Sequence, residues 1–102
     1  SMVEYGLSVV NNEPEEGLRM YYETMELYEE NNRKYPLPAE IIDLSIAIVL
    51  NIAKVDIQQA INLLDIIEIE EFRIETIDKL LVMTDDEYKV VLKGMKEGFK
   101  NE

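Results

Sequence analysis

The stretch that decides the fold of this chain is residues 38–54, which read PAEIIDLSIAIVLNIAK. Apolar residues cover almost every side of a helix built from this segment, and a helix that is apolar all round lies at the centre of a bundle. Isoleucine and valine also favour strands. The length of the segment, its leading proline and its three alanines favour a helix. We therefore predict a central helix from about Pro38 to Lys54.

The composition of the chain restricts its function as strongly as its fold. The 102 residues suit one domain, and 22 acids against 10 bases give a formal net charge of −12. The sequence has no histidine, cysteine or tryptophan. Without histidine no hydroxyl can be activated in the usual way, and without cysteine there is neither thiol chemistry nor a thiolate metal site. We predict a protein that is not an enzyme and needs no cofactor.

Location is inferred from the same composition. The lack of cysteine fits a cytoplasmic protein, and no signal peptide is visible. The longest apolar stretch, Ser45 to Ile52, is interrupted by Asn51 and is far shorter than the roughly 20 residues of a membrane span. We therefore expect no membrane association. Ser1, which precedes Met2, is interpreted as a residue left by cloning.

Residues 1–13 are predicted to form an extended N-terminal arm, and residues 14–102 a single helical domain. Val3, Leu7 and Val9 belong to an alternation of apolar and polar residues with a period of two, which is typical of a strand. One strand cannot form a sheet alone. The arm is therefore expected either to pack on the helices or to pair with the same segment of another copy.

The rest of the chain predicts further helices, giving an all-α, compact bundle of four to five helices. A first helix is expected from Pro14 to about Arg33, and another after Asp56, a suitable N-cap. The acids of residues 68–71 mark a turn or kink, although the alternation in residues 67–70 also allows a short strand. A further helix is expected over residues 72–83.

The last helix has an explicit start signal in the sequence. Thr84-Asp85-Asp86-Glu87 fits a capping box, in which threonine and glutamate each satisfy a free backbone amide. Gly94 and Gly98 thin one side of this helix and would allow another helix to approach closely. The apolar stripe of the helix is formed by Tyr88, Val91, Leu92, Met95 and Phe99.

Residues 55–62 resemble the start of a recognition helix in helix-turn-helix proteins, including those of the winged-helix type. The resemblance implies a tri-helical core. The sequence departs from the pattern at Lys54, where a turn glycine is usual. The outward residues would not neutralise phosphates, so we expect no direct binding of nucleic acid. Two consecutive bundle helices are the favoured interpretation of the segment. These outward residues are Gln58, Gln59, Asn62, Asp65 and Glu68.

Acids and tyrosines indicate the most favoured function, which is contact with a protein partner that has a basic surface. Charge complementarity accelerates such an encounter, and Tyr and Met are enriched at interface cores. Adjacent Tyr21 and Tyr22 cannot both point into a core, so one is expected at its edge or on a partner. Small inhibitors or adaptors from phages and mobile elements, some of which mimic nucleic acid, share this size and charge. The predicted contact residues are Tyr21, Tyr22, Glu26, Tyr28, Glu29, Asp65, Glu68, Glu70 and Glu71.

Two other functions stay open at the level of sequence. The apolar central helix, the arm and the glycine pair also suit a structural protein that associates with itself into a homo-oligomer. A more remote alternative is an enzyme that uses a metal bound by carboxylates, because Asp65, Glu68, Glu70 and Glu71 lie close together in the sequence and hard cations prefer oxygen ligands.

Overall fold

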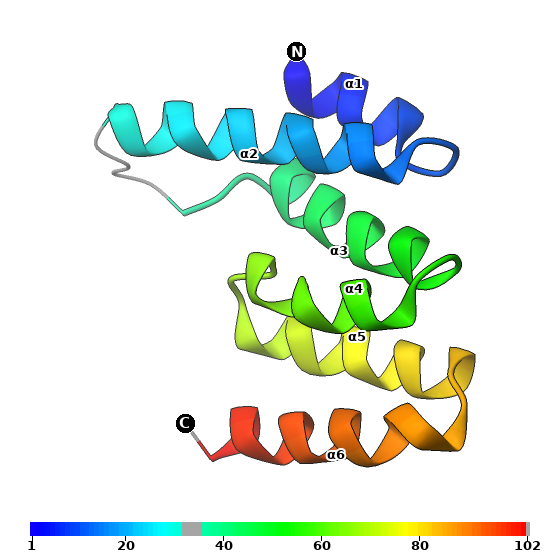
Figure 1. The fold of residues 1–102 in the computed structure, drawn as a ribbon. Coiled ribbons are helices and arrows are strands. Elements are labelled where there is room, and N and C mark those ends of the chain that lie inside the picture. Colours follow the sequence, from blue (N-terminus) through cyan, green and yellow to red (C-terminus); the bar gives the residue numbers. More distant parts are fainter. Residues whose placement is uncertain (32–35, 102) are drawn as a thin grey trace.

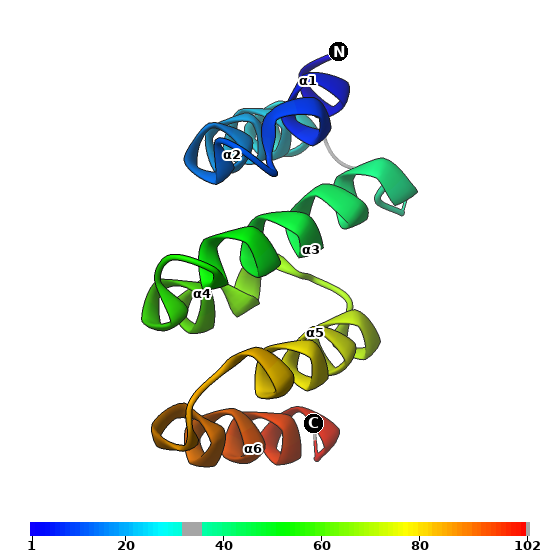
Figure 2. The same cartoon turned by 90° about the vertical axis from the view of Figure 1, so that its right-hand side faces the viewer.

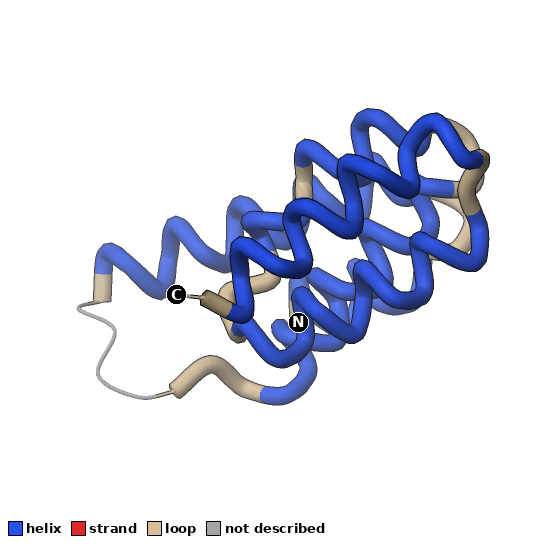
Figure 3. Tube along the Cα trace, turned by 90° about the horizontal axis from the view of Figure 1, so that it is seen from below, coloured by secondary structure: helices blue, strands red, loops and turns tan. Residues whose placement is uncertain are grey.

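The structure is a computed structural model that describes residues 1–31 and 36–101. These residues form helices and connecting loops without any strand, which confirms the all-α prediction (Figures 1 and 3). The elements are α1 (Met2–Val9), α2 (Pro14–Glu30), α3 (Ala39–Ala53), α4 (Ile57–Asn62), the short 3₁₀ helix η1 (Leu64–Ile66), α5 (Glu70–Met83) and α6 (Asp86–Lys100).

Helices that follow each other in the chain pair up, and the pairs stack along one direction. α1 and α2 form one end of the stack, α3 and α4 the middle, and α5 and α6 the other end (Figures 1 and 2). The molecule measures 41 × 33 × 17 Å along its principal axes, so it is flat. Both end pairs therefore expose a broad face that no other part of the described chain covers.

The core of the stack lies along α3. This helix touches α1 and α2 on one side and α4 and α5 on the other. Leu44, Ile48 and Val49 are completely buried, and Ile52 is 1% exposed. Each buried aliphatic side chain of this size contributes about 1.5–3 kcal/mol relative to an exposed one. The prediction that residues 38–54 form the central helix is confirmed.

The extended arm predicted for residues 1–13 is wrong, because most of it is helix α1. Ser1 caps this helix by accepting a hydrogen bond from the Glu4 amide at 3.3 Å. Val3, Leu7 and Val10 also follow a helical spacing, which the alternation with a period of two concealed. Packing decides between the two patterns, since Val10 is only 2% exposed.

A close approach between helices fixes α1 in place. A Cβ atom added at Gly6 would lie 3.0 Å from Leu44 Cδ2 and 3.3 Å from Met20 Cβ, so glycine lets α1 lie directly on α2 and α3. These contacts of Gly6 form only in the tertiary structure, so the sequence of residues 1–13 does not predict them.

The other helix boundaries agree with the sequence to within a few residues. Asp56 is the N-cap of α4, as predicted, and its carboxylate accepts from the Gln59 amide at 3.1 Å. α5 starts at Glu70, two residues before the predicted start, and the turn predicted before it is present. The alternative strand at residues 67–70 is not formed. α2 ends at Glu30, and the predicted end at Arg33 lies outside the described residues.

The predicted capping box at the start of α6 is wrong. Asp85 is the N-cap, and no side chain caps this helix. The box needs the threonine at the N-cap and the glutamate three residues later, but the helix starts one residue too late for Thr84 to occupy that position. The Thr84 hydroxyl oxygen is instead buried without a hydrogen-bond partner.

This buried hydroxyl leads to a prediction for Thr84→Val, which removes the oxygen and keeps the shape. An unpartnered polar atom contributes nothing favourable when buried, so we expect the free energy of unfolding to stay within about 0.5 kcal/mol of wild type or to rise. Asp56→Ala removes a cap that is formed and should therefore lower the free energy of unfolding by about 0.5–2 kcal/mol. Urea unfolding followed by circular dichroism compares the two variants. If Thr84→Val lowered the free energy of unfolding by about 1 kcal/mol, Thr84 would be acting as a cap, and the predicted capping box would be present after all.

Candidate functional site

The outer side of α2 presents carboxylates between two exposed apolar side chains. Tyr22 is 50% exposed and Leu27 is 46% exposed. Because residues three and four apart lie on the same side of a helix, these two flank the glutamates between them. We call this surface the acidic face and define it as Tyr22, Glu23, Glu26, Leu27 and Glu30.

The acidic face is also slightly hollowed. Four of its residues, together with Met2 of α1, line a shallow groove of about 300 Å³. The apolar lining of this groove comes from Met2 and Leu27, and its carboxylates come from Glu23, Glu26 and Glu30. The surface therefore offers apolar contact and negative charge at one place.

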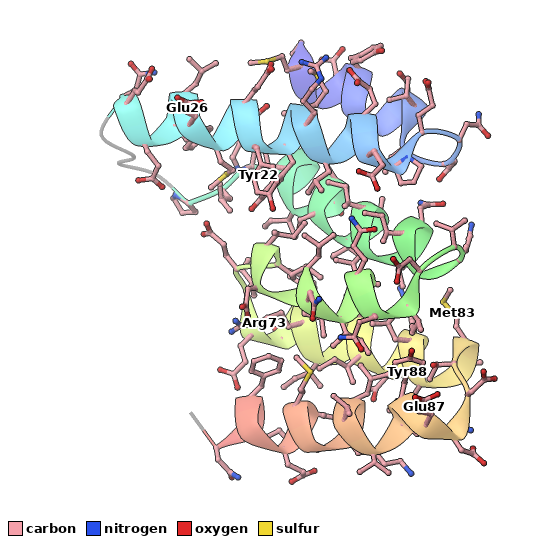
Figure 4. The ribbon with its side chains drawn as sticks, viewed as in Figure 1. Tyr22, Glu26, Arg73, Met83, Glu87 and Tyr88 are labelled. Carbon is pink, nitrogen blue, oxygen red and sulfur yellow. The ribbon has the colours of Figure 1, made fainter. Side chains whose placement is uncertain are left out.

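The acidic face points outward because the opposite side of α2 is packed into the protein. Met20, Tyr21 and Thr24 are buried there against the rest of the stack. The Thr24 hydroxyl donates to the Met20 carbonyl at 2.8 Å, so it needs no partner outside its own helix. Figure 4 shows Tyr22 and Glu26 on the same helix, with their side chains drawn as sticks.

Charge on the acidic face is only partly compensated. Arg19 is the single Lys or Arg side chain in residues 1–31, and it pairs with Glu16 and, at 2.8 Å, with Glu23. The hydrogen bonds from Arg19 lower the pKa of Glu16. Among the described residues, Glu26 and Glu30 have no ion-pair partner. Their carboxylates are available to an external cation.

The two adjacent tyrosines have opposite roles. Tyr21 is 4% exposed, and its hydroxyl donates to the Ile66 carbonyl at 2.8 Å. The prediction that only one of Tyr21 and Tyr22 enters the core is confirmed. The prediction of Tyr21 as a partner contact is wrong, because its ring fills the core and its hydroxyl ties α2 to η1. Tyr22 touches it edge to face, with ring centroids 5.9 Å apart, and stays on the surface.

The other predicted residues of α2 differ in exposure. Glu26 and Glu29 are exposed, whereas Tyr28 is half-buried and packs against the core. Sequence reasoning missed Glu23, Leu27 and Glu30 as members of this surface. The signal was present, because Glu23 and Glu30 each lie three or four residues from Glu26 and from Leu27, and such residues are neighbours on a helix surface.

The second predicted group of acids lies elsewhere. Asp65 is in η1, Glu68 is in the following turn, and Glu70 and Glu71 open α5, where they complement the helix dipole. Because Tyr21 reaches this segment from the buried side of α2, the segment is not part of the acidic face. Nowhere in residues 1–31 and 36–101 do three or more acids gather in a geometry that could hold a metal ion.

The segment that resembles a helix-turn-helix forms two consecutive helices, α3 and the six-residue α4, which contact each other. Two side-chain amides of α4 are engaged within the chain, since Gln58 donates to Asn62 at 3.1 Å and Gln59 to Glu15 at 3.4 Å. Neither amide carries a positive charge, which is what neutralises phosphates in complexes with nucleic acid.

A second groove, which sequence reasoning missed entirely, lies between α3 and α5. Its volume is about 520 Å³, and Val82 on its wall is 88% exposed. Its two basic residues have no carboxylate partner among the described residues: Lys54 donates only to the Asn51 side chain at 3.2 Å, and Lys79 forms no ion pair. We call this site the lysine-rimmed groove; it is lined by Ala47, Leu50, Asn51, Lys54, Lys79, Val82 and Met83.

The fold and these two surfaces define the chain as an acidic, all-helical domain built from stacked helix pairs. It matches no protein family, and neither a curated protein sequence nor a solved structure resembles it to a significant degree. None of the described helices has the length and apolar character required to cross a membrane.

Proposed function

We propose that this protein is a non-enzymatic interaction module whose acidic face binds a basic, partly apolar surface of another protein. The observation that supports this most is the pairing of charge and apolar area on α2. Glu26 and Glu30 have no counter-ion among the described residues, and exposed Tyr22 and Leu27 lie on either side of them.

The tyrosine and the carboxylates of the acidic face contribute to binding in different ways. Tyrosine is enriched among the few residues that supply most of the energy of an interface, because its ring is large, rigid and amphipathic. Unpaired carboxylates attract a basic partner over a distance and raise the association rate. The rest of residues 1–31 adds to the attraction, since Arg19 is their single basic side chain.

A direct test uses a labelled amphipathic peptide with lysines on one side and leucines on the other. We expect the triple variant E23Q/E26Q/E30Q to bind this peptide at least about tenfold more weakly, which corresponds to 1.4 kcal/mol. The matched control is E13Q/E40Q/E75Q, which changes the net charge equally at exposed positions away from the acidic face. Fluorescence anisotropy measures both. If both triple variants lost the same affinity for the peptide, the effect would come from net charge alone, and this would contradict a defined binding site on α2.

Salt dependence tests the electrostatic part separately. Screening shortens the range of the charges from about 10 Å at 0.1 M salt to about 3 Å at 1 M. We expect the affinity of wild type for the basic peptide to fall steeply over this interval and that of E23Q/E26Q/E30Q to fall much less. An affinity that does not change with salt would contradict the proposal.

Nucleic-acid mimicry is the special case in which the basic surface belongs to a nucleic-acid-binding protein. In that case a DNA oligonucleotide and this domain would compete for the same partner. Competition in an anisotropy assay with a labelled oligonucleotide distinguishes this case from a partner with an unrelated basic patch.

A further inference from the structure

We infer that the lysine-rimmed groove of one copy receives the acidic face of a second copy, which would give head-to-tail association. This inference rests on the proposed function, because it names a basic surface that the acidic face binds. It differs from that function in assigning a role to the groove between α3 and α5.

The groove has the features of a binding surface that is not used within its own chain. Val82, at 88% exposed, and Met83, at 43% exposed, leave apolar area in contact with water. In a chain of net charge −12, basic side chains are scarce. Lys54 and Lys79 nevertheless stand beside this apolar area without a carboxylate partner among the described residues.

The two surfaces are complementary in both charge and apolar content. The acidic face carries carboxylates between Tyr22 and Leu27 on one side of α2, and the lysine-rimmed groove has ammonium groups beside apolar side chains. An amphipathic helix that lies in an apolar groove is a common mode of recognition. Glu26 and Glu30, one helical turn apart, would then face Lys54 and Lys79.

The contact must form between different molecules. α2 packs on α1 and α3, and it is not among the helices that pack closely against α5. Figure 4 shows Met83 at one end of α5, well separated from Tyr22 and Glu26. Each copy therefore offers a free groove and a free acidic face at once. Such a head-to-tail contact leaves both surfaces available at the ends of the assembly, so it continues into a ring or an open chain.

Net charge sets the conditions under which this association is observed. Two copies of charge −12 repel each other, and this repulsion is screened beyond about 8 Å at physiological ionic strength. The opposite charges of the docked surfaces lie well within that distance. Experiments at 0.15 M salt therefore retain the local attraction and weaken the long-range repulsion.

The test is a charge swap followed by analytical ultracentrifugation at protein concentrations up to about 200 µM, a range chosen to detect weak contacts of small area. Wild type is expected to gain mass with concentration above its 11.9 kDa monomer. K54E/K79E and E26K/E30K are each expected to stay monomeric, because like charges then meet in the contact. All four positions are exposed, so the substitutions leave the core intact.

Mixing the two variants should restore association, because each offers the charge that the other needs. K54E/K79E has a net charge of −12 − 4 = −16 and E26K/E30K one of −12 + 4 = −8, so general attraction between the two proteins does not explain a complex. The quadruple variant, with both surfaces swapped, should associate by itself. K93E/K100E, which alters exposed lysines of α6 and also has a charge of −16, should behave as wild type.

Two results would overturn the inference. One is a wild type that stays monomeric over the whole concentration range together with a mixture that does not associate. Another is a K54E/K79E variant that associates as well as wild type. Neither result touches the proposed function, which is decided independently by the binding of the basic peptide to E23Q/E26Q/E30Q.

Discussion

Leu44→Ala is expected to lower the free energy of unfolding by about 2–5 kcal/mol. Leu44 is completely buried in the middle of α3 and lies against Gly6 of α1. The substitution removes the isopropyl group beyond Cβ, which loses the free energy of its transfer from water and leaves a cavity where α1 rests on α3. Domains of this size have a total stability of about 5–15 kcal/mol, so the loss would be a large share of it.

Urea unfolding followed by circular dichroism measures this loss. Val90→Ala is the matched control, because Val90 is 76% exposed on α6 and its truncation is expected to change stability by less than about 0.5 kcal/mol. Equal effects of the two substitutions would mean that α3 is not the centre of the fold.

Tyr21→Ala is expected to cost about 3–5 kcal/mol, the range found for buried aromatic side chains. The ring of Tyr21 fills the space between α2 and the following elements, and its hydroxyl donates to the Ile66 carbonyl at 2.8 Å. Tyr21→Phe keeps the ring and removes the hydroxyl together with its hydrogen bond to Ile66, so it should lower the free energy of unfolding by about 0.5–1.5 kcal/mol. The difference between the two variants separates packing from hydrogen bonding.

Tyr22→Ala provides the contrast at the next position. Tyr22 is half-exposed, so its truncation is expected to change the free energy of unfolding by less than about 0.5 kcal/mol while weakening the binding of the basic peptide. Thermal unfolding and anisotropy on the same samples compare the two tyrosines. A Tyr22→Ala variant that unfolds as readily as Tyr21→Ala would contradict the assignment of Tyr22 to the surface.

Much of the fold could be predicted because its signals are local. Residues 38–54 are apolar on almost every side of a helix, so such a helix is stable only when other helices cover it, and α3 is that helix. Asp56 caps α4 through its own carboxylate, an interaction that spans only three residues. Helix geometry alone also predicts that Tyr21 and Tyr22 do not both enter the core, because adjacent side chains point about 100° apart.

The errors arose where distant contacts decide between two local readings. The apolar residues of α1 fit both a strand and a helix, and the burial of Val10 together with the fit of Gly6 against Leu44 selects the helix. At α6, the sequence of a capping box is present, but the turn after α5 places the start of the helix one residue later. The same distinction applies to the two candidate surfaces. Helical spacing predicts which residues belong to the acidic face once the buried side of α2 is known. The lysine-rimmed groove could not be predicted in this way, because it joins residues from two helices.

The sequence by itself determined that this chain is helical, acidic and built around residues 38–54, because hydrophobic spacing and charge act within a few residues of each other. Only the tertiary structure decided that α1 exists, that Tyr21 is inside and Tyr22 outside, and that Lys54 and Lys79 share an apolar groove. The reason is physical: which face of a helix is buried, and which side chains from separate helices become neighbours, depends on how the helices pack and not on any segment alone.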